Sequence, residues 1–340
     1  MIEIKKLLPL LYTLVTIVGW MSIPATILIA VDLKRRGLRF RLAGVREYLS
    51  DRVYKEWIWA FIFLAVDLAW STVFMIFPIL STIGYSLTNF SLVVDLKWMG
   101  LENYITIIKD PIWWHSCWVT LQYTIGVVPV SMAISIVIAL LIIRLPEFGQ
   151  TFFKAAYYLP GVTSAVVMAV ILRWVFNPLY GFANQFLVSL GIEPQMWFGS
   201  SDQALFTVIL TTWLGSHGVG ILIYVAALGG IPKSLYEAAD LDAAGAFTKF
   251  RRITLPLLKP ASLYVLITNL IGSLQVFGPA LLITNGGPSG ATQFVNYYIY
   301  EAFYRFRKMG LAAAMSVVLM LIIVGISIVN YKMLSSDVEY

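Results

Sequence analysis

The sequence predicts an all-α integral membrane protein with about seven transmembrane helices. Hydrophobic residues make up 59% of the 340 residues and charged residues only 12%, whereas apolar residues supply closer to half of a soluble domain. Several apolar runs reach the roughly 20 residues that a helix needs to cross a bilayer. The strict alternation of a membrane β-barrel is absent. Because backbone groups in lipid must be paired within the chain, these runs are expected to be helices.

Seven segments qualify as spans, with boundaries predicted to within a few residues. In order they are 8–31, 60–87, 119–143, 155–176, 205–229, 261–283 and 311–331. The first has an apolar run of about 24 residues, longer than the roughly 7–15 of a signal-peptide core, so we interpret it as a retained span. Gly215, Gly218 and Gly220 predict a break in the fifth span. Such a break is tolerated where the backbone faces protein or a cavity.

Lysine and arginine predict the orientation of the chain, because cytoplasmic loops carry an excess of these residues. The segment 32–56 holds eight of them. With this segment inside, the N-terminus lies outside and the C-terminus in the cytoplasm, and cytoplasmic segments carry 16 Lys and Arg against 7 outside. This bias accounts for the net charge of +6 without a nucleic-acid partner. Tryptophans near the outer span ends are interpreted mostly as an interfacial belt; they are Trp98, Trp113, Trp114, Trp118, Trp174 and Trp197.

The residues of hydrolytic and metal chemistry are sparse. The chain has one cysteine, Cys117, and two histidines, His115 and His217, and none of them forms a metal-binding pattern. The phosphate-binding pattern G-x-x-x-x-G-K-[ST] does not occur. The chain is therefore not predicted to be an enzyme, and no cofactor or metal site is expected in it.

A polar stretch at 232–260 separates the fifth and sixth spans and is predicted to be cytoplasmic. Ser234 and Glu237 fit a capping box at the start of a helix, and Pro256 and Pro260 are expected to end it. One face of that helix would carry alanines and aromatic residues at three- or four-residue spacing, namely Tyr236, Ala239, Ala243, Phe247 and Phe250. The first half of the helix is acidic and its residues are small, which favours docking in a protein groove over lying on a lipid surface.

The same stretch resembles the EAA motif of ABC importer permeases, E-A-A-x-x-D-G-A, five residues, then F-x-x-I-x-L-P. The spacing matches throughout at Glu237-Ala238-Ala239, Asp242, Ala244, Phe250, Ile253 and Leu255-Pro256, while Ala243 replaces the family glycine and Gly245 follows. Other runs resemble the carbohydrate-type (maltose-like) branch: MGLENYITIIKDP from 99, YYLPGV from 157, LITNGGPSGAT from 282 and GLAAAMSVVL from 310. The similarity covers about residues 58–333.

This resemblance implies a permease subunit of an ATP-binding-cassette importer in the cell membrane. It would translocate a di- or oligosaccharide, or a polyol or glycerol-phosphate-like solute. The implied partners are a second homologous permease, two ATPase subunits that bind ATP and magnesium, and a solute-binding protein or lipoprotein. Residues 57–340 would form the six-helix core, and 1–56 an extra N-terminal span with a basic loop. Coupling to the ATPase is assigned to Ser234, Glu237, Ala238, Ala239, Asp242, Ala243, Gly245, Phe250, Ile253, Leu255 and Pro256.

Polar residues within spans are candidates for the substrate pathway, because burial in lipid is costly for them. Amide and aromatic side chains suit a sugar, and the resemblance places the lining of the sugar site on the sixth span. The candidates are Thr268, Asn269, Gly272, Ser273, Gln275 and Phe277, with His217 and Tyr224 from the fifth span. Hydrogen bonding between helices is an alternative role for these side chains.

Two other classes of membrane protein fit the sequence less well. An ion-gradient-driven secondary transporter usually shows internal repeats and membrane carboxylates, but only Asp67 is available here and no repeat is evident. Asp67 has no assigned role, although it could pair with a cation of 32–56. An intramembrane enzyme would need a catalytic cluster, which the sequence lacks.

Overall fold

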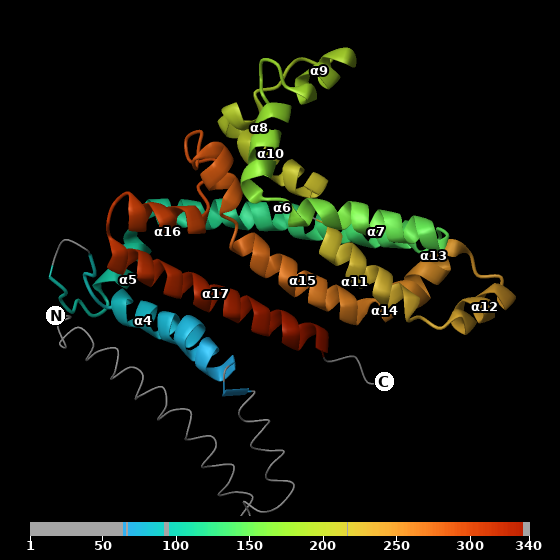
Figure 1. The fold of residues 1–340 in the computed structure, drawn as a ribbon, viewed down its shortest axis with the longest axis horizontal. Helices are drawn as coiled ribbons and strands as arrows, with labels where there is room; N and C mark the ends of the chain where they lie inside the picture. The colour runs from blue at the N-terminus through green and yellow to red at the C-terminus, as the bar shows by residue number, and fades with distance from the viewer. Residues whose placement is uncertain (1–63, 66, 92–94, 216, 336–340) are drawn as a thin grey trace, which may run out of the picture. The chain divides into compact units, whose positions relative to one another are not determined.

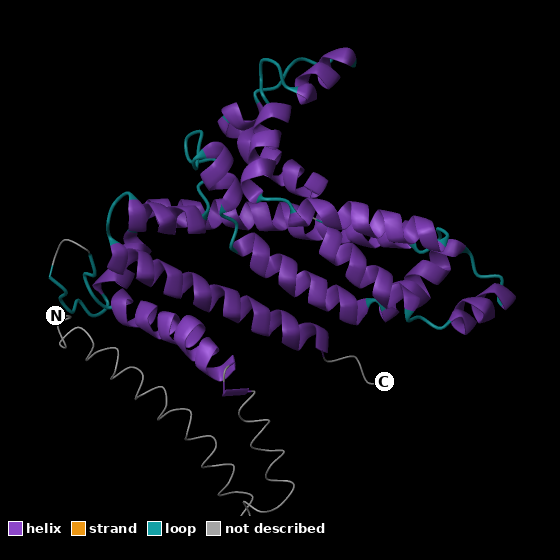
Figure 2. Ribbon diagram, in the orientation of Figure 1, coloured by secondary structure: helices purple, strands orange, loops and turns teal. Residues whose placement is uncertain are grey.

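The computed structural model describes residues 64–335 apart from 66, 92–94 and 216. The predicted span 8–31 and the basic segment 32–56 lie outside the described residues. Within the described part, all regular structure is helical apart from one isolated bridge between Thr88 and Trp98 (Figures 1 and 2). The predicted all-α fold class is confirmed. The chain divides into two compact units, with the boundary between Gly84 and Tyr85 in the sequence, and each is described by itself.

The described part of the first unit is one apolar helical stretch. It contains the π-helix η1 (Thr72–Ile76) and most of α4 (Phe77–Ser86), and residues 67–86 are long and apolar enough to cross a membrane. Asp67 is exposed on this helix. Its predicted partner segment, 32–56, lies outside the described residues, so that pairing stays a prediction.

Two uninterrupted helices of spanning length form the frame of the second unit. They are α6 (Pro111–Ile142) and α17 (Met309–Ser335). α6 covers the predicted span 119–143 except its last residue, and α17 covers the predicted span 311–331. The first turn of α6 is capped by Asp110, whose carboxylate accepts a hydrogen bond from the Ile112 N–H at 2.9 Å.

Three further helix pairs are bent. α7 (Glu147–Val162) meets α8 (Ala165–Val175) at 96°, α10 (Ser201–Gly215) meets α11 (Gly218–Gly229) at 45°, and the run Ala246–Leu257 meets α15 (Lys259–Leu274) at 67°. In the described part of the chain, three helices could cross a membrane, or up to six if each bent pair is one span. The break predicted in the fifth span is present.

The span predicted at 155–176 is not one continuous helix, because the chain turns sharply within it. Thr163 and Ser164 are extended, with ψ values of 143° and 131°, and they separate α7 from α8. Pro160 and Gly161 precede this turn, and both weaken a helix. Hydropathy remains high across the turn, so an apolar count does not detect it.

The sixth span also differs from the prediction of 261–283. α15 ends at Leu274, Val276 and Phe277 are not helical, and a short π-helix, η4 (Ala280–Thr284), follows. Pro279 has no N–H to donate to the carbonyl of Gln275, four residues earlier, so the helical hydrogen bond between these positions cannot form. Gln275 and Phe277 therefore lie at a helix break.

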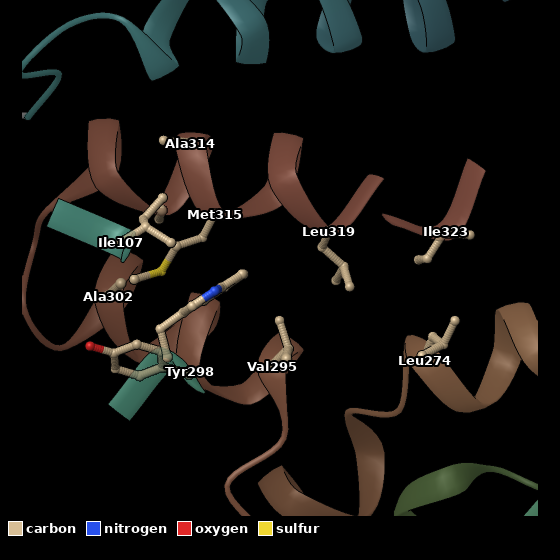
Figure 3. Packing of buried hydrophobic residues seen from close by; sticks show 11 residues of the cluster. Ile107, Leu274, Val295, Tyr298, Ala302, Ala314, Met315, Leu319 and Ile323 are labelled. Atoms are coloured by element: carbon tan, nitrogen blue, oxygen red, sulfur yellow. The ribbon is translucent and has the colours of Figure 1, made fainter. Parts of the chain in front are cut away.

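The second unit packs around α6. α11 lies against α6, α7 and α15, while α15 also contacts α17. At one end, α5 (Glu102–Lys109) and α16 (Val295–Tyr304) pack against α17. Figure 3 shows Met315 of α17 directed toward Ile107 and Tyr298 in this cluster. Trp113 is buried in the same cluster, so it is a packing residue and not part of an interfacial belt.

The remaining short helices lie in the connections. α9 (Phe182–Ser189) and the 3₁₀ turn η2 (Trp197–Gly199) precede α10. α12 (Lys233–Leu241), α13 (Ala246–Lys249), the π-helix η3 (Phe250–Thr254) and α14 (Leu255–Leu257) connect α11 to α15. In Figure 1, α12 and α13 lie at one end of α15, and α16 and α5 lie toward the other.

Candidate functional site

The polar stretch 232–260 forms two short helical arms. The first arm is α12, and the second is the run from α13 through η3 to α14. The first, α12, begins at Lys233 after an extended Pro232, and no side chain caps it. Ser234 therefore lies inside the first turn, and the predicted capping box of Ser234 and Glu237 is wrong. The fixed geometry of Pro232 leads directly into the helix, which leaves Ser234 two positions too late to act as the cap.

The predicted continuous face from Tyr236 to Phe250 is also wrong, because the helix ends between them. The Ala244 N–H donates to the Ala239 carbonyl at 2.9 Å and the Ala243 N–H to the Asp240 carbonyl at 3.0 Å. Ala243 has φ +53°. This is the Schellman arrangement, whose left-handed residue is usually glycine. The glycine of the EAA pattern thus corresponds to a backbone requirement that Ala243 meets under strain.

Side-chain contacts brace the two arms against each other. The Tyr236 hydroxyl lies 2.9 Å from Thr254 Oγ1, and Thr254 is 4% exposed. Across the break, the Lys249 ammonium group forms an ion pair with Asp240. Leu258, at the start of α15, is fully buried in a cluster with Tyr224 and Val265. The loop is therefore anchored in the helix bundle at its base.

Most of the predicted coupling residues lie on the exposed surface of this loop. Exposed are Ser234, Glu237, Ala238, Asp242, Ala243, Gly245, Leu255 and Pro256, whereas Ala239, Phe250 and Ile253 are partly buried. Leu241 and Phe247, on either side of the break, are 90% and 74% exposed. The sequence analysis missed Leu241, although a leucine beside acidic residues was a detectable signal. Pro256 does not end the helical run, which continues to Leu257.

A second group of predicted residues lines one exposed stripe of α15. Beyond Pro260, the exposed residues of this helix are Tyr264, Thr268 and Gly272, and Gln275 continues the stripe at its C-cap. Their spacing of three or four residues places them on one face. By contrast, the exposed residues of α17 include Leu321, Ile322, Val324 and Ile328. A polar and small face is typical of contact with a cavity or another helix, not with lipid. Tyr264 was not predicted.

The other candidates of the sixth span are distributed around this stripe. Asn269 is partly buried, and Ser273 is buried with its hydroxyl donating to the Leu270 carbonyl at 3.0 Å. Phe277 is partly buried against Tyr300, with ring centroids 5.4 Å apart. At the helix break, the Gln275 carbonyl accepts a hydrogen bond from Asn296 Nδ2 at 2.8 Å. The break is thus stabilised by α16.

The two candidates of the fifth span are buried. His217 lies at the α10–α11 break with Nε2 2.5 Å from the Trp213 carbonyl, and its Nδ1 has no partner among the described residues. A Cβ on the neighbouring Gly218 would lie 2.6 Å from the Tyr157 carbonyl, so this glycine allows α7 to approach. Tyr224 is fully buried beside Leu258. Neither side chain lies on the exposed stripe of α15.

Comparison with known proteins identifies the family. Residues 131–336, more than half of the chain, match the model of the binding-protein-dependent transport system inner membrane component. The chain belongs to this family. The permease is 31% identical over 289 residues to the arabinooligosaccharides transport system permease protein AraP of Bacillus subtilis (strain 168), covering 84% of this chain and 91% of AraP. It is 30% identical to the sn-glycerol-3-phosphate transport system permease protein UgpA of Escherichia coli (strain UTI89 / UPEC), covering 86% and 99%.

Solved structures support the same fold. The permease matches a chain in the crystal structure of a bacterial ABC transporter involved in the import of the acidic polysaccharide alginate. The TM-score is 0.73 at 22% identity, with coverage of 85% of this chain and 100% of the other. The permease is thus an ABC transporter component of the inner membrane with the permease fold.

Proposed function

We propose that this permease imports a carbohydrate, or a polyol or glycerol-phosphate-like solute, delivered by an extracellular or periplasmic binding protein. The solutes of two relatives support this class: AraP is a transport permease for arabinooligosaccharides, and UgpA is one for sn-glycerol-3-phosphate. A third relative, the sulfoquinovosyl glycerol permease SmoG of Agrobacterium fabrum (strain C58 / ATCC 33970), is 34% identical over 248 residues and covers 72% of this chain and 80% of SmoG.

The power stroke comes from a partner ATPase that docks on the loop 232–260. The observation that carries this proposal is the loop itself, whose base is anchored by Thr254 and Leu258 while Glu237, Leu241 and Phe247 are exposed. A braced loop transmits movement to the helices instead of absorbing it. Apolar side chains exposed beside a carboxylate fit a protein groove that contains a basic residue.

The solute crosses between this permease and a second homologous permease. The polar stripe of α15, with Thr268, Gly272 and Gln275, faces the pathway, and Asn269 and Phe277 flank it. Substrate sites at discontinuous membrane helices are common in transporters, and Gln275 and Phe277 lie at such a break. Two ATPase subunits bind the ATP and magnesium, so the permease needs no cofactor of its own. The loop 232–260 faces the cytoplasm.

Reconstitution tests this function. The permease, its paired permease, the ATPase subunits and the binding protein are placed in proteoliposomes with ATP on the ATPase side. Uptake of a labelled sugar should require ATP and should stop when the phosphate-binding lysine of the ATPase is replaced. Uptake that persists with this inactive ATPase, driven by an ion gradient, would favour the secondary transporter.

A further inference from the structure

Three aromatic rings form a continuous ladder beside the break in the sixth span. Phe277 and Tyr300 have ring centroids 5.4 Å apart, and Tyr300 and Tyr304 have centroids 4.9 Å apart. The two tyrosines are four residues apart on α16, so they lie on one face about one helical turn apart. We refer to Phe277, Tyr300 and Tyr304 as the ring ladder.

The ring ladder continues the polar stripe of α15. Phe277 follows Gln275 by two residues, and Asn296 of α16 holds the Gln275 carbonyl at 2.8 Å. Exposure increases along the ladder: Phe277 and Tyr300 are partly buried, and Tyr304 is 65% exposed. In Figure 1, α16 lies toward the end of α15 that is opposite α12 and α13. With the loop 232–260 on the cytoplasmic side, as proposed, the ladder leads from the outer end of the permease to the stripe.

Other side chains of α16 hold this helix in place. The Tyr298 hydroxyl donates to the Asp110 carboxylate at the start of α6, and burial together with this hydrogen bond raises the pKa of Tyr298. Glu301 is 8% exposed and accepts from Gln293 Nε2 at 2.6 Å and from Arg305 at 2.5 Å. A rigid helix presents the ladder rings at fixed spacing, which a binding surface needs.

We propose that the ring ladder is a stacking track for the sugar rings of an oligosaccharide, along which the released solute reaches the polar stripe of α15. Aromatic rings offer an apolar face to the C–H groups of a sugar, while the tyrosine hydroxyls remain available for its hydroxyls. An interfacial belt collects aromatic residues at one depth. The ladder instead follows the axis of α16 and begins at the partly buried Phe277. This track rests on the proposed function.

The test compares uptake of a disaccharide and a trisaccharide of the same sugar. Arabinobiose with arabinotriose, and maltose with maltotriose, are supplied to proteoliposomes containing the complete transporter. Tyr304→Leu should lower trisaccharide uptake about three- to tenfold, the effect of losing one aromatic stacking contact. Disaccharide uptake should fall less, because a shorter chain occupies fewer rings. Tyr304→Phe keeps the ring and should retain at least half of the wild-type uptake.

Phe306→Leu is the matched control, since Phe306 is exposed on the same segment and stands outside the ladder. It should leave uptake of both sugars unchanged. Equal losses of disaccharide and trisaccharide uptake in Tyr304→Leu would indicate a structural or belt role and overturn the track, as would unchanged uptake. Because Tyr304 is exposed, the variant is expected to fold, and Tyr300→Leu provides a second test with the same length dependence. A wild-type transporter that takes up sn-glycerol-3-phosphate but none of these sugars would overturn the track and leave the wider solute class of the proposed function intact.

Discussion

Ala243 illustrates how one residue can carry conformational strain in the loop 232–260. It has φ +53° at the position where the EAA pattern has glycine. A left-handed conformation costs a non-glycine residue roughly 1–2 kcal/mol. The first arm of the loop therefore ends less stably than a glycine would allow.

Replacing this residue should remove the strain. In Ala243→Gly, we expect the loop to open less often, so that the Ala244 amide, which is bonded to Ala239, exchanges its hydrogen about fivefold more slowly, corresponding to about 1 kcal/mol. Hydrogen exchange followed by mass spectrometry measures this. Ala244→Gly is the control, because Ala244 is not among the residues with positive φ, and it should destabilise the loop. Unchanged or faster exchange in Ala243→Gly would contradict the strain.

The hydrogen bond between Tyr236 and Thr254 should restrain the loop. Tyr236→Phe and Thr254→Val each remove it, at a cost of about 0.5–1.5 kcal/mol, which corresponds to about two- to tenfold more frequent opening. The rate of cleavage by trypsin at Arg251 and Arg252 measures how often the loop opens, provided that the loop recloses faster than trypsin cuts it. The double variant should be cleaved little faster than the worse single one, because both lose the same bond. Fully additive effects would show that the two hydroxyls act independently.

At the level of elements, the sequence predicted where helices form better than where they break. Long apolar runs identified α6 and α17, and the glycines around His217 marked the break between α10 and α11. The turn at Thr163 and the end of α15 at Gln275 were missed, because both lie inside runs whose hydropathy stays high. The break at Ala243 was missed for a different reason. Alanine is a strong helix former, so nothing local distinguishes it from the helix before it.

The candidate site was predictable in part. Residue chemistry and the resemblance to the carbohydrate-type branch selected Thr268, Gly272 and Gln275, and the structure places all three on one exposed stripe. The sequence could not identify Tyr264 as a member of this stripe, since a tyrosine near a span end is ordinarily an interfacial residue. The contact between Tyr236 and Thr254 joins residues 18 positions apart across the break, and no helical periodicity relates them.

Cysteine accessibility tests whether the α15 stripe meets water. After Cys117→Ser, the variants Thr268→Cys and Gly272→Cys should react with a small charged thiol reagent, because reaction requires a thiolate in contact with water. Gly272 has no atom within 4 Å of an added Cβ, so a cysteine fits there. The controls are Ser273→Cys, at a buried position, and Val324→Cys, on the exposed apolar face of α17; both should stay unreactive. Reaction at Val324 but not at Thr268 would place the stripe against lipid.

At the scale of the second unit, α15 connects the two regions assigned to function. Its start follows the loop 232–260 directly, with Leu258 buried in the bundle, and its end at Gln275 is held by Asn296 of α16. The exposed polar stripe lies between these two anchors. A displacement of the loop would therefore act on the stripe through one helix, without an intervening flexible segment. This arrangement explains why the loop has to be both braced at its base and exposed at its tip.

Replacing Glu237 tests directly whether the loop 232–260 couples the ATPase to transport. Its carboxylate is exposed and has no ion-pair partner among the described residues, so Glu237→Gln should leave folding unchanged. A charge-assisted hydrogen bond to the ATPase is worth about 1.5–3 kcal/mol, so its loss should lower ATP-driven uptake at least about tenfold. The measurement is sugar uptake per ATP hydrolysed in proteoliposomes. Glu147→Gln is the control, since Glu147 is another exposed carboxylate, in the first turn of α7, and should have no effect. Normal uptake by Glu237→Gln, or an equal loss in both variants, would remove the specific coupling role of this residue.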